Sequence, residues 1–86
     1  MEVKKMKIKN FAEWKEAIKR EYDKFSDMYP YLNDDGMDTY AVLSEINFLM
    51  DFCDNTKEML ETFESIKFAK NTVYYNALRL LAKREG

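Results

Sequence analysis

The chain has 86 residues, of which 47% are apolar, and it contains two glycines, one proline, one cysteine and no histidine. The apolar content excludes a disordered chain, and the lack of histidine excludes Ser-His and Cys-His catalysis as well as the commonest metal ligand. The formal net charge of −2 hides an uneven layout, because residues 25–64 hold ten Asp/Glu and one lysine whereas both flanking segments are basic.

We expect one small domain over residues 1–86, because so short a chain rarely holds more than one core. No apolar run approaches the roughly 20 residues that span a bilayer, and the first residues lack the apolar segment of a signal peptide. The single cysteine, Cys53, cannot form an internal disulfide and suits a reducing compartment. These features favour a cytoplasmic protein without membrane contact, in which Cys53 is a packing residue.

A basic segment opens the chain, with apolar side chains among its lysines. We expect a short basic N-terminal arm, and a docked edge strand over residues 3–8 is the second interpretation. The first helix is predicted over about residues 11–28. Asn10 with Glu13 three positions later is typical of a capping box, the apolar residues recur at helical spacing, and Pro30 ends the helix.

The second predicted helix follows the one clear loop. Residues 30–37 are expected to form that loop, because Asn, Asp and Gly supply turn geometry. Asp38 is then the predicted N-cap, and apolar residues at helical spacing continue to Cys53, before a break at residues 54–56. Residues 33–38, Asn-Asp-Asp-Gly-Met-Asp, are also of the kind found in calcium-binding loops. No alignment with the EF-hand loop, however, puts oxygen ligands and glycine at the positions that the loop requires. A solvated turn is therefore expected.

Two further helices complete the predicted fold. The third is capped either by Asn55, with Glu58 completing a capping box, or by Thr56 alone. The fourth covers about Val73 to Arg84. A single continuous helix in place of these two is the alternative. The fold class is therefore all-α, a compact bundle of three or four helices. The residues on the apolar faces that we expect to be buried are Trp14, Ile18, Phe25, Leu43, Leu49, Phe63, Leu78 and Leu81.

The sequence offers no catalytic set and implies no cofactor. Two glycines cannot build a glycine-rich phosphate loop. Carboxylate pairs remain, but catalysis between two carboxylates needs a deep pocket that 86 residues rarely enclose. We therefore expect a protein that is not an enzyme.

The acidic middle is the main functional signal. It is either a set of solvated helix faces, paired internally with the basic ends, or a surface that meets a basic region on another protein. Helical spacing explains Tyr31 less well than Tyr29, and Tyr31 either folds over the core or anchors a partner. The residues predicted to bind a partner are Tyr31, Asp34, Asp35, Asp54, Glu58 and Glu61.

The last sixteen residues support a rival interpretation. Residues 71–86 contain Thr-Val-Tyr, then Leu-x-x-Leu, then a final glycine. The spacings from Val73 to Leu78 and from Leu81 to Gly86 are each one residue longer than in the usual pattern. This pattern resembles the recognition helix of winged helix-turn-helix regulators. The resemblance implies a DNA-binding regulator, in which the residues facing the groove are Asn71, Thr72, Tyr75, Asn76 and Arg79. The acids of the preceding helix would be repelled by a DNA backbone, so tight nucleic-acid binding is not expected.

Our leading hypothesis is a small protein-interaction module that occludes or bridges a partner with a basic surface. In general character the chain is similar to phage-encoded inhibitors of host machinery, such as anti-CRISPR proteins, since it is tiny and acidic in its middle and has no catalytic residues. It contains thirteen aromatic residues, more than a thin core is expected to bury, and this surplus suggests a homodimer.

Overall fold

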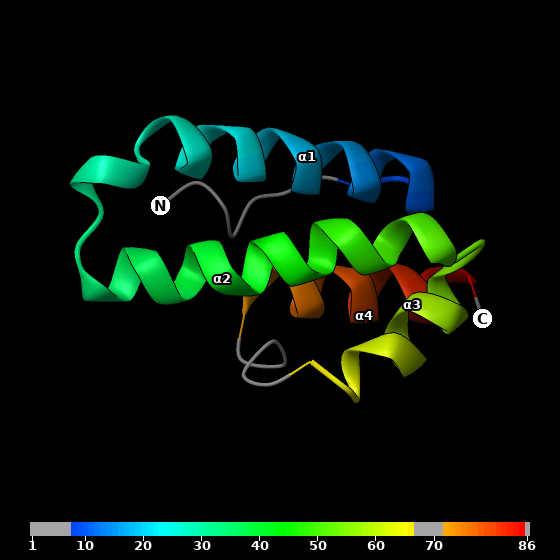
Figure 1. Cartoon of the computed structure of the whole chain (residues 1–86). Helices are drawn as coiled ribbons and strands as arrows, with labels where there is room; N and C mark the ends of the chain where they lie inside the picture. The colour runs from blue at the N-terminus through cyan, green and yellow to red at the C-terminus, as the bar shows by residue number, and fades with distance from the viewer. Residues whose placement is uncertain (1–7, 67–71, 86) are drawn as a thin grey trace.

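The computed structural model describes residues 8–66 and 72–85, which form four α-helices and two short 3-10 helices and include no strand (Figure 1). In chain order the elements are α1 (Phe11–Asp27), η2 (Tyr29–Tyr31), α2 (Asp34–Leu49), η3 (Met50–Phe52), α3 (Thr56–Phe63) and α4 (Val73–Glu85). The predicted all-α bundle is confirmed. The predicted arm or strand lies outside the described residues, except at Ile8 and Lys9, which are not in a strand.

Helix α1 begins as predicted. The Asn10 side chain accepts a hydrogen bond from the Glu13 N–H at 2.9 Å, and the Glu13 carboxylate accepts one from the Lys9 N–H at 2.9 Å. The first bond satisfies one of the amide donors that a helix start leaves without an intrahelical partner, and the second ties Lys9, the residue before the N-cap, to the first turn. The helix ends at Asp27, one residue before the predicted end, and Pro30 lies in η2.

Helix α2 begins earlier than predicted. Its N-cap is Asn33, whose side chain accepts from the Gly36 N–H at 2.8 Å. The predicted cap, Asp38, lies inside the helix, so the prediction of its role was wrong and the loop is shorter than residues 30–37. The helix also ends at Leu49 rather than at Cys53, because residues 50–52 tighten into η3.

Helices α3 and α4 are separate. Asn55 caps α3 by accepting from the Glu58 N–H at 2.9 Å, and Glu58 in turn accepts from the Asp54 N–H at 2.8 Å. The helix ends at Phe63, and turn residues 64–66 follow. The interpretation of one continuous helix was therefore wrong.

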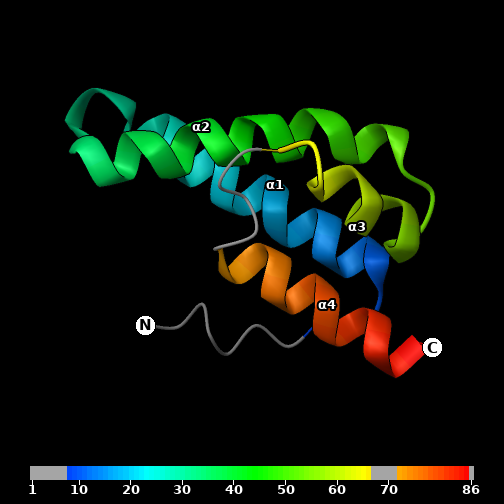
Figure 2. The same ribbon diagram turned by 90° about the horizontal axis from the view of Figure 1, so that it is seen from below.

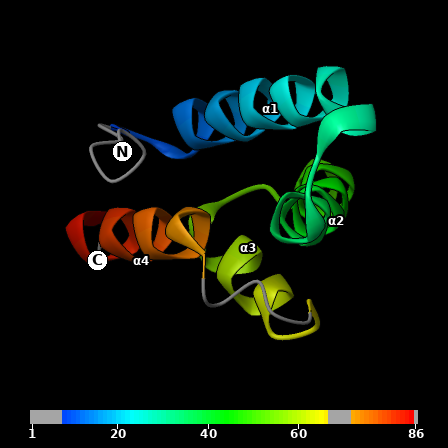
Figure 3. The same ribbon diagram turned by 90° about the vertical axis from the view of Figure 1, so that its left-hand side faces the viewer.

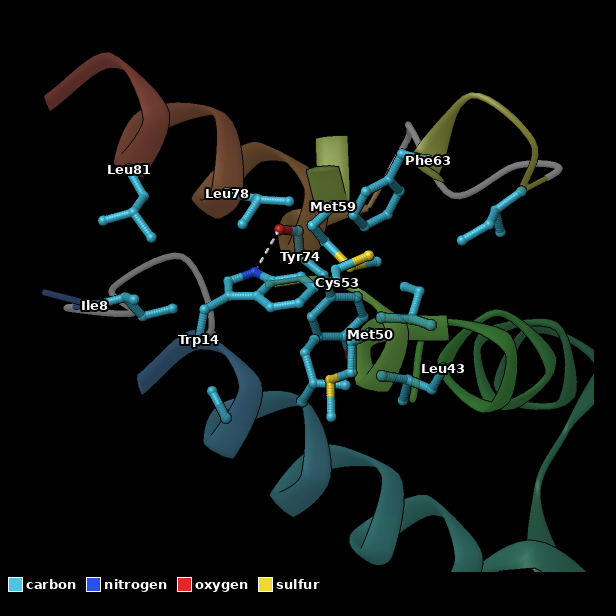
Figure 4. Close-up of a cluster of buried hydrophobic side chains, with 14 residues drawn as sticks. Ile8, Trp14, Leu43, Met50, Cys53, Met59, Phe63, Tyr74, Leu78 and Leu81 are labelled. Carbon is cyan, nitrogen blue, oxygen red and sulfur yellow. Dashed lines mark hydrogen bonds between the residues drawn. The ribbon is translucent and has the colours of Figure 1, made fainter. Parts of the chain in front are cut away.

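The four helices pack around one core. Helix α1 lies over α2 and α4, and α3 lies beneath them between α2 and α4 (Figures 2 and 3). The Trp14 indole N–H donates to the Tyr74 carbonyl at 3.0 Å and thereby joins α1 to α4 at the centre of the cluster (Figure 4). The Arg84 guanidinium donates to the Ile8 carbonyl, which fixes the segment before α1 to the end of α4.

Most of the predicted core is confirmed. Six of the eight residues are buried: Trp14, Ile18, Leu43, Phe63, Leu78 and Leu81. Phe25 and Leu49 are only partly buried against the core, so those two predictions were wrong. Cys53 is buried, as expected of a packing residue, with its sulfur 3.4 Å from the Thr62 hydroxyl.

Candidate protein-interaction surface

The predicted partner-binding residues fall into two groups at opposite ends of α2. Tyr31, Asp34 and Asp35 lie where α1 turns into α2, whereas Asp54, Glu58 and Glu61 lie on α3 and just before it (Figure 1). A helix of 16 residues is about 24 Å long. The two groups therefore form two surfaces, and we name the first, residues 27–38, the α1–α2 corner.

The backbone of the α1–α2 corner is held by short-range hydrogen bonds. The Tyr31 N–H donates to the Met28 carbonyl at 2.8 Å, and the Met37 N–H donates to the Asn33 carbonyl at 2.8 Å. Gly36 allows a close approach here, because a Cβ atom on it would lie 3.0 Å from Leu32 Cδ2. The corner is thus a turn whose backbone is fixed by hydrogen bonds, between the capped end of α1 and the capped start of α2.

Large apolar side chains are exposed on this turn. Tyr31 is 86% exposed, so the expectation that it folds over the core is wrong. Tyr29, which belongs to the apolar spacing of the first helix, is also exposed, as are Met28 and Met37. Exposed tyrosine and methionine side chains are enriched at protein interfaces.

A stack of tyrosines supports the corner. Tyr40 packs against Tyr22 with ring centroids 5.6 Å apart and against Tyr29 at 5.4 Å. Hydrogen bonding with Tyr40 raises the pKa of Tyr22, and hydrogen bonding with Ser26 lowers the pKa of Tyr40. The Tyr29 ring is therefore held in place by Tyr40, which lowers the entropic cost of ordering this side chain when a partner binds.

Four exposed aspartates lie in the same segment as these apolar side chains. No ion pair joins them to a lysine or arginine within residues 8–66 and 72–85. Asp34 and Asp35 also lie in the first turn of α2, where a negative charge interacts favourably with the helix dipole. The acids of the corner are Asp27, Asp34, Asp35 and Asp38.

The α3 group is exposed but is partly used by the fold. Asp54, Glu58 and Glu61 are all exposed, and among the described residues none is paired with a cation. The Glu58 carboxylate, however, accepts from the Asp54 N–H as part of the helix cap. Few apolar side chains accompany these acids, because Met59 and Phe63 on the same helix are buried.

The helix-turn-helix interpretation gains little from the geometry. Residues 64–72 separate α3 from α4, whereas a helix-turn-helix joins its helices through a turn of about three or four residues. Of the residues proposed to face DNA, Asn76 and Arg79 are exposed, but the Tyr75 ring packs 5.1 Å from Phe63. Thr72 is half-buried, and Asn71 lies outside the described residues.

Other kinds of site were sought in the described part of the chain. An open groove between the starts of α1 and α3 is lined by Asp54, Lys15 and the two Asn caps, whose side chains already bond their own helices. No group of three His, Cys, Asp or Glu residues among those described could hold a metal ion. None of the helices within the described ranges is long and apolar enough to cross a membrane.

Sequence spacing missed three apolar members of the corner, which are Met28, Tyr29 and Met37. The signal available in the sequence was Asn33, a residue type that caps helices as well as aspartate does. Comparisons with family models, curated proteins and solved structures find no match for this chain.

Proposed function

We propose that this protein is a small interaction module that binds a basic surface of a partner protein through its α1–α2 corner. One observation carries the proposal. Four large apolar side chains are exposed within residues 27–38, and the same segment holds four exposed aspartates without ion pairs in the described structure.

The apolar and acidic parts of the corner have different roles in this proposal. Tyr31, Tyr29 and the two methionines supply the contact area from which most binding energy comes. The aspartates steer a basic partner toward the corner and reject acidic surfaces. Tyr31 is the expected anchor, because its ring is almost free of contacts within the described structure and stands on a backbone that is already ordered.

Binding of this kind acts by occluding or bridging the partner and needs no bond chemistry. The likeness to phage-encoded inhibitors of host machinery rests on general character alone, and such an inhibitor is one form that this mode of action could take. The α3 acids, Asp54, Glu58 and Glu61, serve in this proposal as a second negative surface that strengthens long-range attraction.

The proposal is tested by comparative affinity capture from an extract of the native host. Wild type, Tyr31→Ala and the double variant Asp34→Asn/Asp35→Asn are immobilised side by side at 50 and 300 mM salt. Glu16→Gln, at an exposed acid on α1 about three helical turns before Asp27, is the matched control. The captured basic protein is then purified, and its dissociation constant is measured for each variant by calorimetry.

We expect Tyr31→Ala to weaken binding by about 30-fold, the scale of an interface hot spot. The double variant should weaken binding mainly at low salt, because its charges act over a Debye length of roughly 10 Å at 0.1 M. Equal capture of the same proteins by all four baits would overturn the proposal. So would a partner that loses affinity only when Asp54 and Glu61 are neutralised.

A further inference from the structure

A second exposed apolar surface lies at the other end of α2. Phe48 is 63% exposed and Phe52 is 71% exposed, and their rings meet edge to face with centroids 5.4 Å apart. Two large aromatic side chains gain nothing from folding when they remain in water. Together they form one continuous apolar patch, whereas apolar residues that are exposed singly are common on protein surfaces and need no explanation.

Negative charge borders this patch. Glu45 precedes Phe48 by one helical turn, and Asp51 follows it by three residues; both carboxylates are exposed and have no ion pair in the described structure. We name these four residues, Glu45, Phe48, Asp51 and Phe52, the phenylalanine face. A complement for this face has an apolar centre and a positive border.

Helix α4 carries such a complement. Leu80 is 62% exposed, and the exposed Arg79 and Lys83 lie beside it on the helix. The Arg79 guanidinium lies 5.9 Å from the Tyr75 ring centroid, which holds it near the helix surface. Arg84 is not counted, because it already bonds the Ile8 carbonyl. We name Arg79, Leu80 and Lys83 the leucine face.

We infer that the phenylalanine face of one molecule docks on the leucine face of a second copy. The apolar centres cover each other, and the charged borders are opposite in sign, which favours this pairing over phenylalanine face on phenylalanine face. Because the two faces lie on different helices, the contact is heterologous, and the resulting dimer retains one free phenylalanine face and one free leucine face. The inference is independent of the α1–α2 corner.

Sedimentation velocity on the full chain tests the inference. Samples between 5 and 500 µM are compared at 50 and 500 mM salt. We expect the mass to rise above 10.3 kDa with concentration and to rise less at high salt, since the charged borders are screened. Sedimentation of a 10.3 kDa species at every concentration would overturn the inference.

Complementary variants test the heterologous geometry. One variant, Phe48→Ser/Phe52→Ser, loses the phenylalanine face, and another, Leu80→Ser/Lys83→Glu, loses the leucine face. Each alone should remain monomeric, with self-association at least tenfold weaker. An equimolar mixture should form a dimer and stop there, because only one pair of intact faces remains. Lys19→Glu, which reverses an exposed charge on α1 outside the corner and outside both faces, is the matched control and should associate like wild type.

Other outcomes contradict this geometry. If the leucine-face variant still dimerises alone, the phenylalanine face pairs with itself and the inference is wrong. If Tyr31→Ala abolishes association, the corner is the interface instead. Circular dichroism confirms that each variant is folded. If the phenylalanine double variant unfolds, Asp51→Lys replaces it. Asp51→Lys alone should associate more weakly than wild type. Mixing it with Arg79→Glu/Lys83→Glu should restore association, because the charged borders of the two proteins are again opposite in sign.

Discussion

Thr56 carries a buried hydroxyl that has no hydrogen-bond partner in the described structure. The residue is the first of α3 and is 2% exposed. An unpartnered buried polar group costs about 1–3 kcal/mol, because it loses its bonds to water and gains none. Thr56→Val keeps the shape and removes the polar atom. We expect it to raise the free energy of unfolding by about 1 kcal/mol, measured by urea denaturation.

Thr62 provides the matched control on the same helix. Its hydroxyl donates to the Glu58 carbonyl at 2.9 Å and lies 3.4 Å from the Cys53 sulfur. Thr62→Val therefore removes groups that are in use and should be neutral or destabilising. Destabilisation by Thr56→Val would show that the Thr56 hydroxyl is bonded in solution.

At the scale of single residues, helical spacing predicted burial correctly for six of eight residues, including Phe63 at the end of α3, and failed at Phe25 and Leu49. Trp14 and Ile18 lie in the first half of α1, where neighbours on several elements surround them. Phe25 has the same spacing but lies near the end of α1, and it is only partly buried. Spacing predicts which face a side chain occupies; it does not predict whether another element covers that face.

Among the elements, the start of α2 is the clearest difference between sequence and structure. Asn33 and Asp38 are both residues that cap helices well, and Gly36 between them is a poor helix former. The structure places Gly36 in the first turn, where a Cβ would lie only 3.2 Å from the capping oxygen of Asn33. The structure uses Asn33 as the cap, so the general preference of glycine against helices does not decide where α2 starts.

The corrected cap gives a direct prediction for α2. Asn33→Ala removes the acceptor of the Gly36 N–H and should lower the free energy of unfolding by about 0.5–2 kcal/mol. Asp38→Ala, at the position predicted from sequence, should change it by less than about 0.5 kcal/mol, as exposed substitutions do. Thermal melts followed by circular dichroism distinguish the two. The reverse order would restore the later helix start.

The stability of the whole molecule should fall in strong alkali because of Tyr74. Burial of its ring, with a smaller contribution from Glu21, raises the pKa of Tyr74 from 10.0 to about 12. The unfolded chain therefore loses this proton first. The contribution to stability is complete below pH 10 and is lost as the pH rises toward 12, at up to about 1.4 kcal/mol per pH unit.

Tyr74→Phe isolates this effect. Urea denaturation of the wild type and the variant between pH 9 and 12 should show a steeper loss of stability in the wild type. Tyr31→Phe, which removes an exposed phenol, should behave as the wild type does. Parallel curves for the wild type and Tyr74→Phe would mean that the phenol ionises equally easily in both states.

For the whole molecule, sequence predicted the fold class but not the arrangement of its surfaces. One of the two interpretations of the acids in residues 25–64 was a surface that meets a partner, and the structure divides the predicted partner-binding acids between the two ends of α2. Which ends of helices meet is decided by long-range packing such as the Trp14–Tyr74 bond, which joins residues 60 positions apart. Local patterns contain no information about that pairing.

The burial of Trp14 makes the chain its own optical reporter. It is the single tryptophan, it is fully buried, and its N–H is bonded. Its fluorescence therefore reports on the interior and should stay blue-shifted and resistant to aqueous quenchers while the fold is intact. A ligand that covers only surface side chains leaves that emission in place. A red shift on adding a partner would reveal that binding has opened the core.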